Sequence, residues 1–499
     1  MILKKLVLLI GISLAFYSCG KSDPSPKPVT GDNDMVVGSE VLIPSFVGNG
    51  VQWGGYDLLL NWTGSATLST SDWEKLFLRV SYMRPPLVRL MVSPGWNYMA
   101  GGQFAPEKSE DVLCKILDFC EQQNIDVIIG EWGHKGGDEI DQNWLENAAK
   151  FVDWLLNTKN YTCIQYYNMV NEPNGDWSSI NGNYTLWKTL LEQFHQKLVE
   201  KNLASRLELI GPDIAIWDVA LTGWVLNTQN DLGDKVTTYD IHTYPDEAIV
   251  RSGNYQTLVK SYRNNAPASA KMIMGELGFK YKATSDLGIE NSRRISADKY
   301  ASDDSNMFTY DAFYGVDVAD AIIQNMRAGY AGNILWDLDD AMYDIDGSGT
   351  KLKRWGFWNI LGSEKFENDE DENIRPWFYP ASLLCRYFPR QTKILNVTLP
   401  NKYGLRAIAG ELNGKYTIAI VNSHTVDYSI NLKAEGGLVV QNADVYKYDA
   451  GSGSDFEGEI DGSGFPVPDL ENQAFDFSNA EGFELDIPAQ SFMLITNIN

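Results

Sequence analysis

Histidine and basic residues are scarce in this chain. Four histidines occur in 499 residues, and no two of them have the spacing of metal ligands, so a zinc site is not expected. Lysine and arginine number 41 against 66 acidic residues, which gives a formal net charge of −25. Such a charge repels nucleic acids and other polyanions. The composition therefore excludes nucleic acid as a partner and favours a neutral or cationic ligand.

Cysteine is also rare, and a nucleotide-binding glycine motif is absent. Besides Cys19 there are four cysteines: Cys114 and Cys120 share one expected helix, Cys163 opens an apolar run, and the fourth is Cys385. We predict isolated core thiols and no disulfide scaffold. No Gly-x-Gly-x-x-Gly sequence follows an expected strand, which counts against a doubly wound open sheet as the alternative α/β fold.

The N-terminal segment has the pattern of an export signal. Residues 1–18 combine a basic start with an apolar run and end in Ser18, directly before Cys19. The run is too short to span a membrane and predicts a signal peptide. Cleavage before Cys19 resembles bacterial lipoprotein processing, although Phe16 replaces the usual leucine; ordinary secretion is the alternative. We expect an exported protein of a Gram-negative bacterium, anchored through a lipid on Cys19 at the cell surface or in the periplasm.

The largest part of the chain alternates between short apolar runs and longer amphipathic segments. It follows residues 19–35, whose Pro, Ser, Gly, Lys and Asp content is typical of a flexible tether. Eight apolar runs separated by helical patterns predict a (β/α)8 TIM barrel, which we place at residues 36–383. The expected strands are 51–53, 87–92, 125–129, 164–170, 207–210, 238–242, 272–274 and 333–336.

The pattern of the sequence changes after residue 383. Short strand-like runs, separated by Gly, Asn and Asp turns, predict an antiparallel β-sandwich over residues 384–499. Residues 36–45 are a candidate additional strand of this sandwich. We expect the domain to pack against the barrel as a structural unit, with sugar binding as the alternative. The protein is expected to be a monomer that contacts the membrane only through its lipid.

Two glutamates close expected strands of the barrel. Glu172 lies in an Asn171-Glu-Pro sequence after the fourth strand, and Glu276 lies in a Gly-Glu-Leu-Gly sequence at the end of the seventh. The carboxyl ends of parallel barrel strands meet at one face, so the two carboxylates are expected to face each other. Retaining glycoside hydrolysis requires such a pair, about 5 to 5.5 Å apart. In the alternative interpretation, Asn171 caps a helix and Glu172 lies in its first turn.

Other residues at the strand ends suit the chemistry of sugars. Asn171 can bind a substrate hydroxyl, and Arg89 and Tyr244 can hold a carboxylate nucleophile ionised. Trp336 offers a flat apolar face for a sugar ring. The remaining candidates, for which packing in the core is the alternative, are His242, Trp53 and Trp177.

The order of these motifs resembles a known group of enzymes. It is similar to the clan of (β/α)8 retaining glycoside hydrolases, and most similar to the cellulase-like family 5, with families 30, 39 and 51 as relatives that carry a linked sandwich. The resemblance implies that Glu172 is the acid/base and Glu276 the nucleophile. It also implies a histidine after strand three, where Glu131 and Trp132 are alternatives to His134 as the inward residue. The matching positions are Arg89, His134, Asn171, Glu172, His242, Tyr244, Glu276 and Trp336.

We therefore expect a retaining β-glycoside hydrolase that cleaves a neutral β-linked poly- or oligosaccharide without a cofactor. The alternatives are a non-catalytic surface glycan-binding protein on the same scaffold, or a transglycosylase that uses the same intermediate. An acidic loop over residues 337–346 continues at Asp344 like a calcium loop, but Trp355 stands where the twelfth position requires glutamate. We predict that this loop is solvated and that the protein holds no metal.

Overall fold

The computed structural model describes residues 31–59, 68–133, 139–342, 351–477, 479 and 481–499. The predicted signal peptide, the lipidation site Cys19, most of the tether, His134 and residues 343–346 of the acidic loop lie outside the described residues. The prediction that this loop is solvated is wrong for its described part, because Asp337, Asp339 and Asp340 are fully buried. Within the described ranges, no helix combines the length and the apolar character needed to cross a bilayer.

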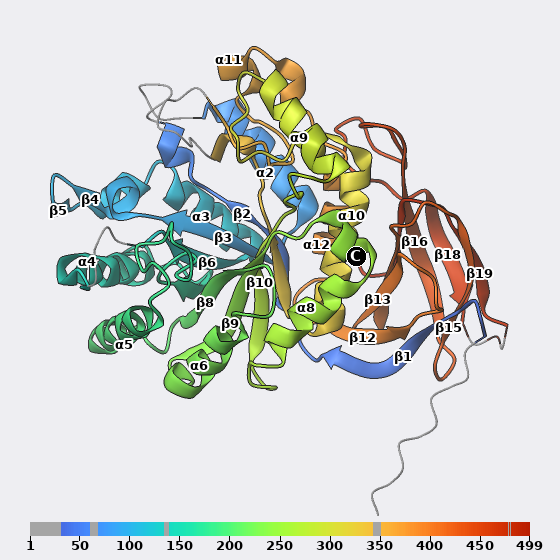
Figure 1. Cartoon of the computed structure of the whole chain (residues 1–499), viewed down its shortest axis with the longest axis horizontal. Helices are drawn as coiled ribbons and strands as arrows, with labels where there is room; N and C mark the ends of the chain where they lie inside the picture. Colours follow the sequence, from blue (N-terminus) through green and yellow to red (C-terminus); the bar gives the residue numbers. More distant parts are fainter. Residues whose placement is uncertain (1–30, 60–67, 134–138, 343–350, 478, 480) are drawn as a thin grey trace, which may run out of the picture.

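A closed barrel of eight parallel strands forms the larger part of the molecule (Figure 1). Strand β11 pairs with β2 and closes the barrel. The prediction of a (β/α)8 barrel is thus confirmed. The strands, in their order around the barrel, are β2 (Gly48–Trp53), β3 (Leu87–Val92), β6 (Asp126–Glu131), β7 (Ile164–Asn168), β8 (Glu208–Ile216), β9 (Val236–Thr243), β10 (Lys271–Leu277) and β11 (Gly332–Leu335).

Each barrel strand is followed by a helix that buries an apolar face. In α2, Ser69 caps the first turn in a capping box with Asp72, and Leu76, Val80 and Met83 are buried at helical spacing. Additional helices, α7 (Glu247–Arg251), α9 (Asp286–Ala297) and α11 (Gly362–Phe366), lie in the connections. The helices that follow the strands are α2 (Thr70–Met83), α3 (Leu113–Gln123), α4 (Gln142–Asp153), α5 (Tyr184–Glu200), α6 (Thr222–Leu232), α8 (Asn254–Arg263), α10 (Ala312–Ala328) and α12 (Phe378–Arg386).

The C-terminal part is a second β domain, as predicted, but its strands form one continuous curled sheet. The order is β17-β16-β20-β14-β13-β12-β1-β15-β19, with β18 beside β16. The strands are β12 (Lys393–Thr398), β13 (Leu405–Leu412), β14 (Lys415–Asn422), β15 (Tyr428–Ala434), β16 (Val439–Ala450), β17 (Phe456–Glu457), β18 (Leu470–Asp476), β19 (Phe483–Ile487) and β20 (Ser491–Thr496).

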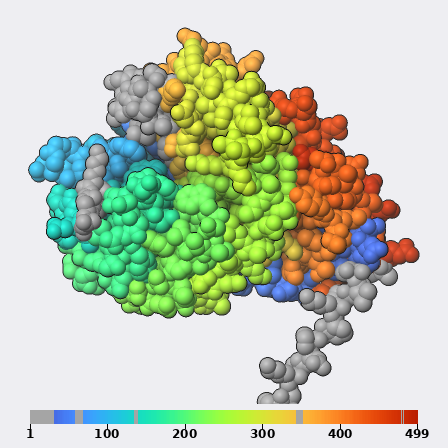
Figure 2. All heavy atoms as spheres, in the orientation of Figure 1, coloured from blue at the N-terminus to red at the C-terminus, as the bar shows by residue number. Residues whose placement is uncertain are grey.

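Strand β1 (Asp34–Ile43) joins the C-terminal sheet from the other end of the chain. It pairs antiparallel with β12 and parallel with β15, and Figure 2 shows it in blue against the orange and red of the sheet. Hairpins make sequential strands antiparallel, whereas a strand that arrives from a distant segment is free of that constraint. The sheet is therefore mixed and not wholly antiparallel.

Helix α10 joins the barrel to the sheet (Figure 1), contacting α8 on one side and β13 on the other. Its Asp320 is fully buried and pairs with Arg406 of β13 at 3.0 Å, while Ser423 donates to the same carboxylate at 2.7 Å. Burial raises the pKa of Asp320 to about 6, although Arg406 acts in the opposite direction. The contact between the domains thus includes a buried ion pair.

We expect Arg406→Ala to lower the free energy of unfolding by about 3–5 kcal/mol, because it leaves Asp320 buried without its cation. Chemical denaturation followed by circular dichroism measures the change. The matched control is Lys393→Ala, which removes an exposed ion pair with Glu411 on the same sheet and should leave the midpoint nearly unchanged. A wild-type midpoint in Arg406→Ala would contradict this account.

Candidate active site

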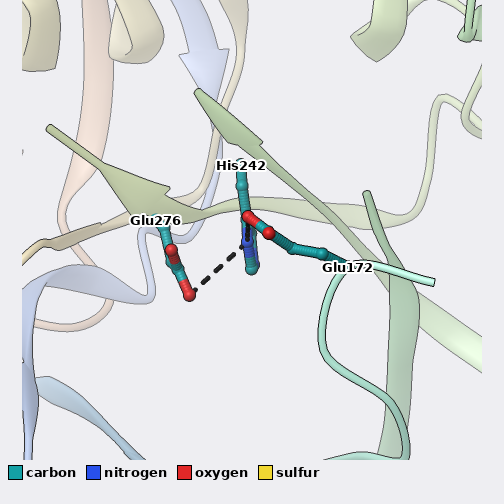
Figure 3. A group of neighbouring side chains, drawn as sticks. All are labelled: Glu172, His242 and Glu276. Carbon is teal, nitrogen blue, oxygen red and sulfur yellow. Dashed lines mark hydrogen bonds and ion pairs between the residues drawn. The ribbon is translucent and has the colours of Figure 1, made fainter. Parts of the chain in front are cut away.

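Two glutamates and a histidine converge at the carboxyl ends of the barrel strands (Figure 3). Glu276 lies in β10, His242 in the neighbouring β9, and Glu172 in the loop after β7. One oxygen of each carboxylate and one ring nitrogen of His242 all lie within 4.8 Å of one another. Carboxyl groups about 5 to 5.5 Å apart are typical of retaining glycosidases, and separations of about 6.5–9.5 Å of inverting ones. The geometry matches the retaining arrangement.

The backbone at Glu172 adopts a conformation that is uncommon for a side chain of this size. Its φ of 46° lies in the left-handed region, and its N–H donates to the carbonyl oxygen of Asp213 at 3.1 Å. The carboxylate accepts two further hydrogen bonds, from His242 Nδ1 to Oε1 at 3.0 Å and from Trp177 Nε1 to Oε2 at 2.7 Å. Both oxygens of Glu172 are therefore held in place.

Glu276 is buried and accepts hydrogen bonds at both oxygens. Arg89 Nη1 donates to Oε1 at 2.6 Å, and the Tyr244 hydroxyl donates to Oε2. Burial raises the pKa of Glu276, while the charges of His242 and Arg89 act to lower it. The chain near Glu276 has no room for larger residues, because a Cβ at Gly275 would lie 3.0 Å from the His242 ring. Donors and close packing together orient this carboxylate.

Arg89 lies at the centre of the site and is 1% exposed. Besides Glu276, it donates to Asn171 Oδ1 at 2.8 Å, to Gln52 Oε1 at 3.2 Å and to Asp213 Oδ2 at 3.2 Å. Burial disfavours the charged guanidinium, but Asp213 and Glu276 outweigh burial and raise the pKa of Arg89. Because Asn171 Oδ1 accepts from Arg89, the amide nitrogen is the group that Asn171 offers to a ligand.

His242 connects the acid/base candidate to a buried aspartate. Its Nε2 lies 2.8 Å from Asp213 Oδ1, opposite the nitrogen that contacts Glu172. Burial disfavours a charged ring, but Asp213 and Glu276 outweigh it and hold the pKa of His242 well above the usual 6.5. Burial likewise opposes charge on Asp213, yet His242 and Arg89 lower its pKa to about 2. We therefore assign an imidazolium that donates to Glu172 and Asp213.

A second aspartate lies beneath this pair. Asp240 is buried in β9, and its Oδ1 accepts the backbone N–H of Asp213 at 2.8 Å. Burial and the neighbouring Asp213 raise the pKa of Asp240 well above its usual value. The two carboxyl groups thus divide their roles, with Asp213 as the anion and Asp240 as the neutral acid.

Most of the predicted site residues that the structure describes lie together at the barrel mouth, whereas Trp53 does not. Arg89, His242 and Tyr244 contact the two glutamates directly, Asn171 accepts from Arg89, and Trp177 donates to Glu172. Trp336 directly follows β11 and is 6% exposed, and its backbone N–H donates to the backbone carbonyl of Leu277, the last residue of β10, at 3.0 Å.

Trp53 is a correction to the sequence analysis. Its side chain is fully buried and packs edge-to-face on Phe77 of α2 and Phe119 of α3. It therefore belongs to the layer between barrel and helices and offers no platform to a sugar. Among the alternatives to His134, Glu131 is buried and its carboxylate accepts from Tyr98 at 3.0 Å and Tyr167 at 3.4 Å, whereas Trp132 is half-buried.

Sequence reasoning missed Asp213, Asp240 and Gln52. The predicted fifth strand ends at Ile210, whereas β8 continues through the Gly211-Pro212 pair to Ile216. The signal for Asp240 was present: it precedes His242 by two residues in an apolar strand, and such positions share one face. A charge in an apolar run needs a buried partner.

Among the described residues, two groups of side chains place donor atoms close enough to surround a metal ion. They are Glu172, His242 and Glu276, and Asp213, Asp240 and His242, with the atoms of each group within 4.8 Å of one another. Both ring nitrogens of His242 already face carboxylates, and Arg89 adds a second positive charge. These cations balance the carboxylates, so we assign no metal to either group.

The fold is shared with solved glycoside hydrolases at low sequence identity. A family 30, subfamily 8 xylanase from Clostridium acetobutylicum is 14% identical with a TM-score of 0.59, over 93% of this chain and 99% of that chain. An α-L-arabinofuranosidase from Thermotoga maritima is 13% identical with a TM-score of 0.61, over 93% and 99%. An endo-β1,6-glucanase is 12% identical with a TM-score of 0.57, over 95% and 94%. No protein-family model and no curated protein matches the sequence.

At these identities the likeness establishes the fold alone. The matching structures combine the barrel and the β domain in one architecture and come from families 30 and 51, among others. Both families stand among the relatives that the linked C-terminal sandwich suggested. The finer assignment to family 5 receives no specific support from these structures.

The raised pKa of His242 predicts a ring that stays protonated at both nitrogens at pH 7.5. Because the folded pKa exceeds the unfolded one, the stability from this proton is present below about pH 6.5 and is lost as pH rises through the folded pKa. Imidazole NMR of ¹³C,¹⁵N-histidine protein measures the protonation. His195, whose pKa is lowered by burial and then by Lys235, is the neutral control, assigned with His195→Asn. A neutral His242 ring at pH 7.5 would contradict the assignment.

Proposed function

We propose that this protein is a retaining glycoside hydrolase that cleaves neutral β-linked poly- or oligosaccharides. The observation that carries the proposal is the pair Glu172 and Glu276, with carboxylate oxygens within 4.8 Å at the ends of two strands of one barrel mouth. A network of hydrogen-bond donors orients both carboxylates, as acid/base and nucleophilic chemistry requires. The fold shared with a xylanase, a β1,6-glucanase and arabinofuranosidases supports a carbohydrate substrate.

In the first step a Glu276 oxygen attacks the anomeric carbon while the bond to the leaving oxygen breaks. Glu172, protonated for this step, gives its proton to that oxygen, and a covalent glycosyl-enzyme forms. Arg89 and Tyr244 hold Glu276 in the orientation of attack. In the second step Glu172 takes a proton from water, the water oxygen attacks the anomeric carbon, and Glu276 leaves as the carboxylate. The configuration is inverted twice and so retained.

His242 and Asn171 assist without exchanging a bond with the substrate. His242 holds Glu172 by its Nδ1 contact, and Asp213 fixes the ring from the other side. Asn171 presents its amide nitrogen beside the nucleophile, in position to donate to a sugar hydroxyl. The net charge of −25 favours neutral glycans over anionic ones.

Glu276→Ala is expected to lower kcat by at least about 10³-fold, because the nucleophile is lost. Glu172→Gln should lower polysaccharide hydrolysis by about 10²–10⁴-fold, but the first step on a dinitrophenyl glycoside much less, since a good leaving group needs little protonation. Reducing-sugar release from a panel of neutral β-linked glycans measures hydrolysis, and the initial release of dinitrophenolate measures the first step on the aryl glycoside. Glu411→Gln, on the far domain, is the matched control with wild-type activity. Full activity in Glu276→Ala would refute the roles assigned here.

The short carboxylate separation predicts retention of the anomeric configuration. ¹H NMR of the first product should show the β-anomer before mutarotation, and a 2-deoxy-2-fluoro glycoside should leave a covalent adduct on Glu276 that mass spectrometry locates. A first-formed α-anomer, with no adduct, would identify an inverting enzyme instead. Glycan binding without any cleavage would favour the glycan-binding protein.

We also propose, on the sequence of residues 1–35 alone, that the protein is exported and lipid-anchored through Cys19. Expression in a Gram-negative host with labelled palmitate should transfer label to the wild type and none to Cys19→Ala. Equal labelling of both chains would exclude a lipid at this position, and release of an unlabelled mature chain would indicate ordinary secretion.

A further inference from the structure

Four tryptophans lie on four successive loops at the carboxyl face of the barrel. Trp96 follows β3, Trp132 follows β6, Trp177 follows β7 and Trp217 follows β8. Their rings meet edge-on in two pairs, Trp96 with Trp132 at 6.5 Å and Trp177 with Trp217 at 6.0 Å between centroids. Trp177 and Trp217 are 56% and 60% exposed. Exposed apolar rings gathered at one place indicate a binding surface.

A groove of about 990 Å³ begins at this arc. Trp96, Trp132 and Trp177 line it together with the polar side chains of Asp141, Asn143 and Ser178. Binding sites for small molecules measure about 300–1,000 Å³, so the groove has room for more than one sugar ring. Flat apolar faces beside amide and hydroxyl groups are the combination that recognises sugars, which carry both kinds of surface.

The groove is continuous with the catalytic pair through one residue. Trp177 lines the groove and donates from Nε1 to Glu172 Oε2 at 2.7 Å. A glycan whose scissile bond lies between Glu172 and Glu276 therefore has its next rings beside Trp177. None of the described residues that line the groove is basic, and Asp141 adds a negative charge, so the lining suits a neutral chain and not a polyuronate.

We propose that this groove binds consecutive sugar units of a neutral glycan chain on the Glu172 side of the cleaved bond, and that the enzyme therefore prefers substrates with several units on that side. The inference rests on the proposed function and adds to it the length of the substrate. Trp96 and Trp132 are its binding residues on the loops after β3 and β6, and Trp177 is the residue that joins the groove to the acid/base.

The test compares kcat/KM along an oligosaccharide series of two to six units of the glycan that the wild type cleaves. We expect kcat/KM to rise with length in the wild type, and Trp96→Ala and Trp132→Ala each to reduce the value for the longest substrate about three- to ten-fold more than that for the shortest. Trp96→Phe should recover part of the rise, because it keeps an apolar ring. Tyr403→Ala, which removes an exposed ring from the C-terminal domain, is the matched control and should keep the full rise.

Binding separates failure of the groove from failure of the hydrolase. Affinity gels with neutral polysaccharides, run on Glu276→Ala with and without Trp96→Ala, report the groove without turnover. The groove is overturned, and the proposed function stands, if hydrolysis depends on Glu172 and Glu276 but not on chain length. The same conclusion follows if kcat/KM keeps its full length dependence in both tryptophan variants. If the wild type cleaves nothing, but a polysaccharide retards Glu276→Ala and Trp96→Ala removes that retardation, the groove is supported and the proposed function is overturned. If the wild type cleaves none of the glycans and none of them retards it, the groove and the proposed function are both rejected. Circular dichroism confirms that each variant folds.

Discussion

The buried guanidinium of Arg89 is the interaction on which the centre of the barrel depends. It lies among Glu276, Asp213, Asn171 and Gln52, and its charge allows two carboxylates to be buried at the end of an apolar barrel. An isolated carboxylate at this depth would give up its charge. The ion pair that permits burial also orients Glu276, so one contact serves both stability and reactivity.

His242 extends this network to the second glutamate. Its ring lies between Asp213 and Glu172 and within 3.5 Å of Glu276, so the catalytic pair shares one buried cation as a neighbour. A change of charge on either glutamate alters the potential at the other through that ring. The left-handed backbone at Glu172 and its N–H bond to Asp213 link the loop after β7 to strand β8. Chemistry on one loop thus depends on the neighbouring strand.

Local patterns predicted the barrel and the glutamate pair, and they failed where orientation mattered. The periodicity of apolar residues predicted each strand and the helix that follows it, and the polar residues at the strand ends indicated the mouth of the barrel. Trp53 is the last residue of its strand and Trp336 directly follows another strand, so the sequence presents them alike. Trp53 nevertheless packs on Phe77 and Phe119 among the helices. Alternation along a strand does not tell which of its two faces points toward the barrel axis. The role of Asp213 was missed because the predicted fifth strand ended at Ile210, whereas β8 continues to Ile216.

The sequence by itself determined the order of the elements, the two carboxylates that follow strands four and seven, and the charges embedded in apolar strands, because each of these is written in neighbouring residues. Only the tertiary structure decided how close Glu172 and Glu276 lie, that His242 is held as a cation, which tryptophans reach solvent, and that β1 joins the C-terminal sheet. These features join groups far apart along the chain. Their separations, and the low dielectric that sets their charges, exist only after the barrel has closed and excluded water.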